Sequence, residues 1–394
     1  MGNTKNLKRK IKRALISVSN KENLNKLLNV LKKFDVEIFS SGGTHKEIKK
    51  LGFKSKEVSE YTNYPEILGG RVKTIHPMIH GGILMKRNNK IHKKESLKNN
   101  FLEIDLVVVN FYPFEKVIRE TNNQNKIVEN IDIGGPALVR GAAKNYNDVA
   151  VITNADQYDD FISEITKYNG YTSIQFREKF SSYAFSETGY YDSLISNHFN
   201  NYQGIKFPRK KLISANLVEK LRYGENPHQE AAIYASSLLD IEKISGKELS
   251  FNNYNDIFAA LNISKSLPKN RGTVIVKHTN PCGVSAAKIK VDSFKLALKC
   301  DPISAFGGVV SCNFKIDRKV ALEINKMFFE VIVANGFDNA AINILRKKKN
   351  LRLINAKKLS KNFNQSISTN FNALITQTSD NKEFLRRNFR VVSK

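Results

Sequence analysis

The alternation of short apolar runs with segments of helical period most constrains the fold of this chain. ALISVS at residues 14–19 is rich in β-forming residues, and the segment 21–34 places four leucines at helical spacing after Asn20, a plausible N-cap. IDLVVVNFYPF at 104–114 is almost continuously apolar, which is typical of a strand buried on both faces. Strands that alternate with helices in this way predict an α/β fold with a parallel sheet.

The alternation continues to about residue 200 and then lapses. Residues 200–221 carry glycine, proline and a basic run, so we place a domain boundary there. The sequence predicts a first domain over 1–200, a linker over 201–220 and a second α/β domain over 221–394. Further elements expected are strands at 36–44, 148–153 and 273–278, the first ending in a Gly-rich turn, and helices at 45–52, 155–166, 174–199, 255–267, 291–299 and 318–328.

The chain of 394 residues is strongly basic, because 64 lysines and arginines stand against 37 aspartates and glutamates, a net charge of +27. Such a charge favours polyanions or phosphorylated substrates as partners. Lys and Asn, however, crowd stretches such as 86–100 and 343–364, which we expect to be solvated, and no stacking aromatics are interleaved with them. A nucleic-acid-binding module is therefore not favoured, and we expect no specific nucleic-acid partner.

The cysteines and the apolar runs bear on the compartment. Cys282, Cys300 and Cys312 form no CxxC or His-paired spacing, so neither a disulfide framework nor a zinc knuckle is indicated. No apolar run approaches the roughly 20 residues that span a bilayer. The N-terminus also lacks the apolar region of a signal peptide. We therefore expect a cytoplasmic protein without a membrane partner.

The segment LGGRVKTIHPMIHGGIL at 68–84 allows two interpretations. His76 and His80 stand four residues apart, which on a helix would suggest a zinc site. Pro77 disfavours helical geometry at His76, and no cysteine or HExxH-type glutamate accompanies the pair. The sequence therefore favours a strained basic loop that holds an anion with Arg71 and Lys73, and no metal is expected.

Five loops rich in Gly, Ser, Thr and basic residues follow the expected strands. Each alone is weak evidence, because a pair of glycines is more often only a turn. Together they predict a site for a phosphorylated ligand, since the carboxyl ends of parallel strands and helix N-termini offer backbone N–H groups to an anion. The loops are SVSNK (17–21), SGGT (41–44), GGRVKT (69–74), NFYPF (110–114) and DIGGPALVRGAAKN (132–145).

These stretches resemble the bifunctional purine-biosynthesis enzymes that join an IMP cyclohydrolase to an AICAR transformylase. The resemblance covers the chain from about residue 12 to its end. It implies a methylglyoxal-synthase-like parallel-sheet domain followed by a cytidine-deaminase-like α/β domain. The family sequence continues past FRVVSK (389–394), so the resemblance implies an incomplete second domain whose transformylase is inactive alone. The matching motifs are SVSNK, SSGGT, YPEILGGRVKTIHPMIHGGIL, VVVNFYPF, ENIDIGGPALVRGAAKN, LRYGENPHQ, VKHTNPCGV and DPISAFGG.

The resemblance assigns the catalytic roles of the cyclohydrolase, which closes formyl-AICAR to IMP with loss of water. Lys144 would be the proton donor and acceptor, and Asp132 would orient the reacting amide with Tyr112 nearby. Taken singly, the same three residues also fit an end-of-helix cation, a helix cap and a packed aromatic. Only the matched set of motifs favours the catalytic interpretation.

Further cyclohydrolase residues are implied to bind the substrate. Lys73 and Thr74 would hold the formyl oxygen, and Arg71 would contribute positive potential. The remaining implied contacts, to phosphate, ribose and base, are Ser19, Asn20, Lys21, Ser41, Gly42, Gly43, Thr44, Asn110 and Ile133. The cyclohydrolase is expected to need no cofactor.

The transformylase roles implied by the resemblance lie in the second domain. His278 would take a proton from the AICAR amine, and Lys277 would stabilise charge on the formyl group delivered by 10-formyl-tetrahydrofolate. A homodimer is expected from the family. A non-catalytic module that only binds purine nucleotides is the alternative function. The implied AICAR contacts are Arg222, Tyr223, Gly307 and Glu330.

Overall fold

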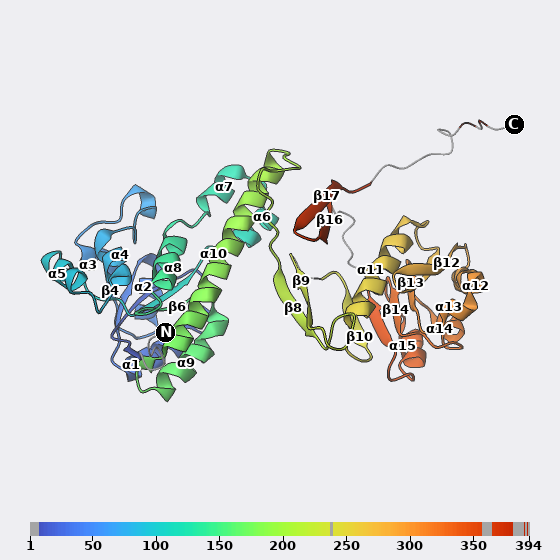
Figure 1. Cartoon of the computed structure of the whole chain (residues 1–394), viewed down its shortest axis with the longest axis horizontal. Coiled ribbons are helices and arrows are strands. Elements are labelled where there is room, and N and C mark those ends of the chain that lie inside the picture. Colours follow the sequence, from blue (N-terminus) through green and yellow to red (C-terminus); the bar gives the residue numbers. More distant parts are fainter. Residues whose placement is uncertain (1–7, 237–238, 357–364, 381–389, 391, 393–394) are drawn as a thin grey trace. The chain divides into compact units, whose positions relative to one another are not determined.

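The computed structural model describes residues 8–236, 239–356, 365–380, 390 and 392. The chain divides into two compact units, Met1–Ser214 and Ala215–Lys394 (Figure 1). Within the range 201–220, α10 (Ile174–Tyr202) ends and β8 (Asn216–Leu221) begins. The assignment of this range as a linker stays a prediction.

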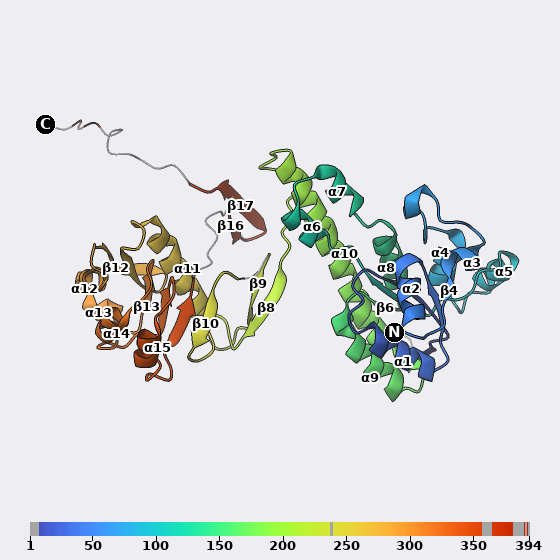
Figure 2. The ribbon, with the colours of Figure 1, turned by 180° about the vertical axis from the view of Figure 1, so that it is seen from behind.

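A five-stranded parallel sheet forms the centre of the first unit, with helices on both faces (Figures 1 and 2). The strand order is β4-β3-β2-β5-β6, and every neighbouring pair is parallel. The predicted parallel α/β fold is therefore confirmed. The strands are β2 (Arg13–Val18), β3 (Glu37–Ser40), β4 (Lys56–Glu57), β5 (Leu106–Asn110) and β6 (Ala150–Ile152).

Helices and short elements precede, connect and follow these strands. The helices are α1 (Leu24–Lys33), α2 (Gly42–Lys50), α3 (Val58–Thr62), α4 (Pro77–Leu84), α5 (Lys90–Lys98), α6 (Phe114–Glu120), α7 (Gln124–Glu129), α8 (Gly134–Lys144) and α9 (Tyr158–Lys167). The short elements are the 3₁₀ turns η1 (Leu68–Gly70) and η2 (Ala155–Gln157) and the antiparallel pair β1 (Arg9–Lys10) and β7 (Tyr171–Thr172).

The sheet has a separate core on each face, because successive side chains of a strand point to opposite sides. Ile16 of β2 packs with the leucines of α1 and with the buried residues of α9. Leu15, its neighbour in the strand, packs on the other face with α4 and α8. β5 is buried on both faces, as its apolar run predicts.

Two helix starts differ from the sequence prediction. Asn20 is not an N-cap: its side chain accepts a hydrogen bond from the backbone of Glu22, and α1 begins at Leu24 after Asn23 in left-handed conformation. The helix expected at 45–52 begins at Gly42, so SGGT opens a helix where only a turn was expected. Asn20 lies before the helix, where its backbone N–H donates to the Asn110 side chain at the end of β5.

The second unit is built on a six-stranded mixed sheet of order β10-β15-β14-β13-β11-β12. The three central neighbours β13, β14 and β15 are parallel, and the flanking pairs are antiparallel. The strands are β10 (Glu242–Ser245), β11 (Gly272–Lys277), β12 (Asn280–Ala286), β13 (Val309–Cys312), β14 (Val331–Ala334) and β15 (Arg352–Asn355).

Helices cover both faces of this sheet as well. Buried residues of α11 pack on one face, and those of α12, α14 and α15 pack on the other. Separate hairpins are formed by β8 with β9 and by β16 with β17. The additional elements are β9 (Ala231–Ala235), α11 (Phe251–Ser266), α12 (Lys290–Cys300), α13 (Pro302–Ala305), α14 (Arg318–Ile324), α15 (Asn339–Leu345), β16 (Gln365–Asn370) and β17 (Ala373–Thr378).

The two basic stretches expected to be solvated are only partly so. In 86–100, α5 has no buried residue, but Arg87 is buried and donates to the carbonyls of Gly82, Met85 and Ile104. In 343–364, the strand β15 lies inside the sheet with three buried residues, which corrects the prediction. Residues 357–364 lie outside the described part of the chain.

Candidate active site

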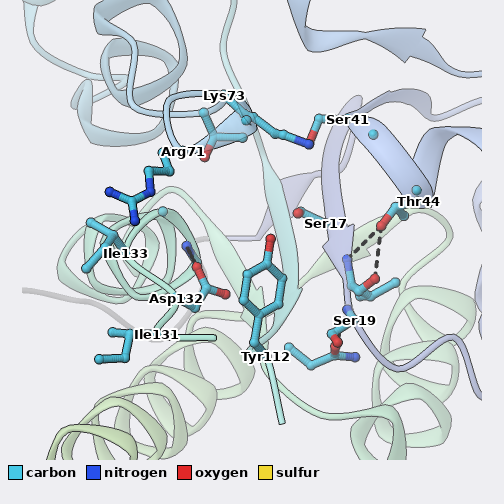
Figure 3. Close-up of a pocket in the computed structure, with 18 of the residues that line it drawn as sticks. Ser17, Ser19, Ser41, Thr44, Arg71, Lys73, Tyr112, Ile131, Asp132 and Ile133 are labelled. Carbon is cyan, nitrogen blue, oxygen red and sulfur yellow. Dashed lines mark hydrogen bonds between the residues drawn. The ribbon is translucent and has the colours of Figure 1, made fainter. Parts of the chain in front are cut away.

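A cavity of about 600 Å³ opens at the carboxyl edge of the parallel sheet in the first unit (Figure 3). β2, β3 and β5 end there, because the carboxyl ends of parallel strands meet at one edge. The residues that follow these ends line it, together with segments 69–75 and 128–135. Of the predicted cyclohydrolase residues, those that line it are Ser19, Lys21, Ser41, Gly42, Gly43, Thr44, Arg71, Lys73, Thr74, Asn110, Tyr112, Asp132 and Ile133.

The floor of the cavity is held by side chains that bond to backbone. The Asn110 amide oxygen accepts from the backbone N–H groups of Ser19 (2.6 Å) and Asn20 (2.9 Å). The Thr44 hydroxyl both accepts from the N–H of Val18 and donates to its carbonyl, each at 3.0 Å (Figure 3). These bonds tie the end of β2 to the first turn of α2, and the loop after β2 to the end of β5.

Two helix N-termini face the cavity. α2 begins at Gly42 and α8 at Gly134, and both glycines line the cavity. The first N–H groups of a helix have no partner within it and carry partial positive charge, so they attract an anion. The arrangement therefore suits a ligand with at least one anionic group.

Each of the two cations predicted in the basic loop is paired with a carboxylate. Lys73 Nζ lies 3.2 Å from Glu66 Oε2, and Arg71 pairs with Glu129 of α7. Figure 3 shows Lys73 reaching toward Ser41. Sequence reasoning missed both glutamates. Glu66 stands within the matched motif YPEILGG, which is the only signal that could have found it.

Asp132 lies both at the start of a helix and at the cavity, so its position fits the helix-cap and the catalytic interpretation alike. Its Oδ1 accepts from the N–H of Gly135 at 2.8 Å, which caps the start of α8, and its carboxylate also lines the cavity. Burial raises the pKa of the Asp132 carboxyl, opposed by hydrogen bonds from the N–H groups of Gly135 and Tyr112. Its own N–H donates to the Tyr191 hydroxyl of α10 at 2.9 Å, a contact that sequence reasoning did not find.

Lys144 and Asn20 do not line the cavity. Lys144 is the last of the eleven residues of α8 and is exposed, whereas the first residue, Gly134, is at the cavity. With a rise of about 1.5 Å per residue, the helix separates the two ends by about 15 Å. The structure therefore brings Lys73, Tyr112 and Asp132 together in one unit but leaves Lys144 at the far end of α8.

The segment 68–84 is a loop only as far as His76. Leu68, Gly69 and Gly70 all have positive φ, and a helix begins directly at Pro77, so the expectation of a loop throughout is wrong. Proline suits the first helical position, because its missing N–H would have no partner there. His76 Nδ1 accepts from the N–H of Met78 at 3.2 Å, which caps α4. Among the described residues, no group of three His, Cys, Asp or Glu side chains could hold a metal ion.

Four of the predicted transformylase residues, Lys277, His278, Gly307 and Glu330, lie at one edge of the sheet of the second unit. Strand pairing places the end of β11 at the same sheet edge as the starts of β13, β14 and β15. Lys277 is the last residue of β11, Gly307 lies shortly before β13, and Glu330 directly precedes β14. Lys277 Nζ donates to the carbonyl of Phe306 at 2.9 Å. His278 has a positive φ of 53° and is exposed.

Arg352 is a residue of this edge that sequence reasoning missed. It is buried, its guanidinium lies 3.7 Å from Glu330, and it donates to the carbonyl of Glu248. Burial lowers the pKa of Arg352, the negative charge of Glu330 opposes this shift, and the positive charge of Arg222 acts in the same direction as burial. Glu330 also accepts from the Asn253 amide at 2.9 Å.

Family comparisons agree with this architecture. The model of the MGS-like domain matches residues 23–137, and that of the AICARFT/IMPCHase bienzyme matches residues 142–394. The parallel-sheet unit with the cavity thus corresponds to the MGS-like domain, and a mixed α/β unit follows it. The chain is an α/β protein of the class that carries an MGS-like domain. Within that class, the chain belongs to the AICARFT/IMPCHase bienzyme family, whose two activities are the last two steps of purine biosynthesis.

Similar proteins include several bifunctional purine biosynthesis proteins PurH. That of Leptospira biflexa is 43% identical over 388 residues, which are 98% of this chain and 75% of the relative. That of Bradyrhizobium diazoefficiens is 42% identical over 395 residues, 98% of this chain and 74% of the relative. A solved chain, from the crystal structure of ForH, is 28% identical with a TM-score of 0.43 and covers 48% of this chain and 99% of its own.

Within the described residues, no helix combines the length and the apolar character needed to cross a bilayer.

Proposed function

We propose that the cavity of the first unit closes formyl-AICAR to IMP. The observation that carries the proposal is the meeting of two helix N-termini, two carboxylate-paired cations and a partly buried carboxyl group in one cavity. The helix N-termini and the cations suit a phosphorylated nucleotide, and the carboxyl group suits a reaction that transfers protons.

The chemistry sets three requirements. A bond forms between the carboxamide nitrogen and the formyl carbon. The formyl oxygen leaves as water, which takes one proton from the carboxamide nitrogen and one from the nitrogen that carries the formyl group. The nitrogen is a weak nucleophile, the formyl oxygen gains negative charge, and both arms of the substrate must be held together. The site therefore needs a cation or N–H donor at the oxygen, and a group that accepts and returns protons.

The residues of the cavity meet these requirements in the proposed binding mode. The substrate phosphate lies at the N-terminus of α2, and Lys73 and Thr74 face the formyl oxygen. Asp132 orients the amide and can hold a proton, because its burial raises the pKa of its carboxyl. The remaining proposed contacts are Asn20, which does not line the cavity, and the lining residues Ser19, Lys21, Ser41, Gly42, Gly43, Thr44, Arg71, Asn110, Tyr112 and Ile133.

The proton shuttle assigned to Lys144 rests on the resemblance alone. Lys144 is exposed at the far end of α8 from this cavity. The role of Lys144 therefore stays a prediction, which Lys144→Ala tests.

The second unit carries the proposed AICAR formylation site. Lys277 and His278 would act on the formyl group and on the AICAR amine, with 10-formyl-tetrahydrofolate as co-substrate. The residues that would bind AICAR are Arg222, Tyr223, Gly307 and Glu330. The starts of β13, β14 and β15 lie at one edge of the sheet, where the acidic Glu330 is 3.7 Å from the basic Arg352. We also propose that the protein works as a homodimer in the cytoplasm.

An absorbance assay with formyl-AICAR tests the cyclohydrolase proposal, and addition of AICAR with 10-formyl-tetrahydrofolate tests the transformylase. We expect IMP to form from formyl-AICAR and Lys73→Ala to lose most of that activity. Binding of IMP without turnover in the wild type would instead favour the alternative, a non-catalytic nucleotide-binding module.

A further inference from the structure

Glu66 lies opposite Lys73 because the chain folds back on itself between them. An isolated antiparallel bridge joins Ile67 to Val72, so the residues just outside it, Glu66 and Lys73, are brought side by side. Their ion pair measures 3.2 Å, and the side chains are 35% and 31% exposed. Glu66 is not among the residues that line the cavity, whereas Lys73 is.

Two glycines complete a slot for the Lys73 side chain. A Cβ atom on Gly70 would stand 2.5 Å from Lys73 Cε, and one on Gly42 would stand 2.9 Å from Lys73 Nζ. A contact below 3.0 Å cannot be accommodated without movement, so a side chain at either position would displace the end of Lys73 from this place. The carboxylate of Glu66 is at the same place, with Oε1 4.0 Å from the Gly42 Cβ position.

Without Glu66, the positive charge of Lys73 would lie in an electrostatically unfavourable position. Gly42 is the first residue of α2, and the N-terminus of a helix carries partial positive charge that repels an ammonium group. A carboxylate 3.2 Å away offsets this repulsion. Since solvent-accessible ion pairs stabilise a fold by only about 0–1 kcal/mol, a contribution to folding gives little reason for this arrangement.

We propose that Glu66 is a positioning residue of the cyclohydrolase, which holds the ammonium of Lys73 in the cavity where the formyl oxygen gains charge. The inference rests on the proposed function of the cavity. Glu66 acts only through Lys73 and touches no reacting atom. Its loss removes the carboxylate that holds the ammonium, so the substrate phosphate at the start of α2 draws Lys73 away from the formyl oxygen. The effect falls on the transition state, because the formyl oxygen is most negative there.

Glu66→Gln is the main test, since it removes the charge and keeps the shape. We expect kcat for formyl-AICAR to fall about 10- to 100-fold, as for a misplaced catalytic group, while KM changes less than about threefold. Glu66→Asp keeps the carboxylate on a shorter arm and should retain an intermediate kcat. If Glu66→Gln does not fold, Glu66→Asp takes its place in every comparison.

Glu47→Gln is the matched control. Glu47 is also an ion-paired glutamate, 4.0 Å from Lys50, but both lie on α2 away from the cavity. This variant should keep wild-type kcat and KM. Thermal unfolding of all variants checks that the fold is intact.

A double-mutant cycle distinguishes positioning from a general structural role. In a Lys73→Ala background, adding Glu66→Gln should change kcat/KM by less than about twofold, because there is no ammonium left to hold. Effects of the two substitutions that multiply, or a wild-type kcat in Glu66→Gln, would overturn the proposal while the cyclohydrolase assignment stands. A wild type that does not turn over formyl-AICAR would instead overturn the proposed function, and this inference with it.

Discussion

The carboxylate of Asp132 accepts a hydrogen bond of 2.8 Å from the backbone N–H of Gly135, three residues further along the chain. This bond caps the first turn of α8, and the same carboxylate lines the cavity of the first unit. One side chain thus starts a helix and presents an ionisable group to the ligand, so substitutions of Asp132 should affect both stability and turnover.

Asp132→Asn should separate the two roles, because asparagine caps a helix about as well as aspartate. We expect the fold to persist and kcat for formyl-AICAR to fall by at least about tenfold through loss of the ionisable group. Asp132→Ala should in addition lower the free energy of unfolding by about 1 kcal/mol through loss of the cap. Urea unfolding and steady-state kinetics measure the two effects, and equal stability of the two variants would contradict the capping role.

The pH dependence of stability follows from the raised pKa of Asp132. The folded chain holds this proton more tightly than the unfolded chain, so its contribution is fully present below the ordinary value of 3.8 and is lost as pH rises through the raised pKa. Relative to Asp132→Asn, the wild type should therefore lose stability over that interval. Urea unfolding of both proteins across the interval measures the difference, and a constant difference would count against the raised pKa.

Tyr191→Phe and Tyr158→Phe form a matched pair of hydroxyl deletions. The Tyr191 hydroxyl accepts from the N–H of Asp132, so its loss should cost about 1–2 kcal/mol and reduce kcat. The Tyr158 hydroxyl is buried and has no hydrogen-bond partner within the described part of the chain. Its removal should be neutral or stabilising by up to about 1 kcal/mol. Equal destabilisation in the two variants, measured by urea unfolding, would contradict this account.

Gly70→Ala and Gly52→Ala compare a clash with simple backbone strain. Both glycines have positive φ, 89° and 82°, so each substitution should cost about 1 kcal/mol. Only at Gly70 would the new methyl group strike Lys73, since nothing lies within 4 Å of the Cβ position at Gly52. Cyclohydrolase kcat should therefore fall in Gly70→Ala alone. A normal kcat in that variant would show that the Lys73 side chain can move without loss.

Arg177→Met tests a buried cation far from the cavity. Arg177 of α10 is fully buried and donates to the carbonyls of Tyr146, Asn147 and Thr172, and burial lowers its pKa to about 10. Its loss leaves these carbonyls without their donor and should cost about 3–5 kcal/mol. Thermal unfolding checks this, and a melting temperature near that of the wild type would contradict it.

Lys144→Ala tests the role assigned by resemblance. We expect formation of IMP to be lost while the dissociation constant for IMP changes little, because Lys144 does not line the cavity. Its exposed position at the end of α8 should make the substitution harmless to folding. Near-normal turnover would remove Lys144 from the catalytic residues.

The local pattern of the sequence predicted the parallel sheet of the first unit and the loops at its carboxyl edge. Apolar runs such as that of β5 and the leucines of α1 report burial through period alone. Pattern failed where burial depends on distant partners. β15 follows a lysine run and was expected to be solvated, yet it pairs with β14 inside the sheet of the second unit.

What the sequence by itself determined is the order of elements and the kinds of residue at the cavity, among them Arg71, Lys73 and Asp132. Only the tertiary structure decided their partners. Tyr191 reaches Asp132 across 59 residues, Glu66 meets Lys73 through a reversal of the chain, and α8 carries Lys144 away from the cavity. The physical reason is that periodicity is set by neighbours along the chain, whereas hydrogen bonds and ion pairs are set by distances in space that packing fixes.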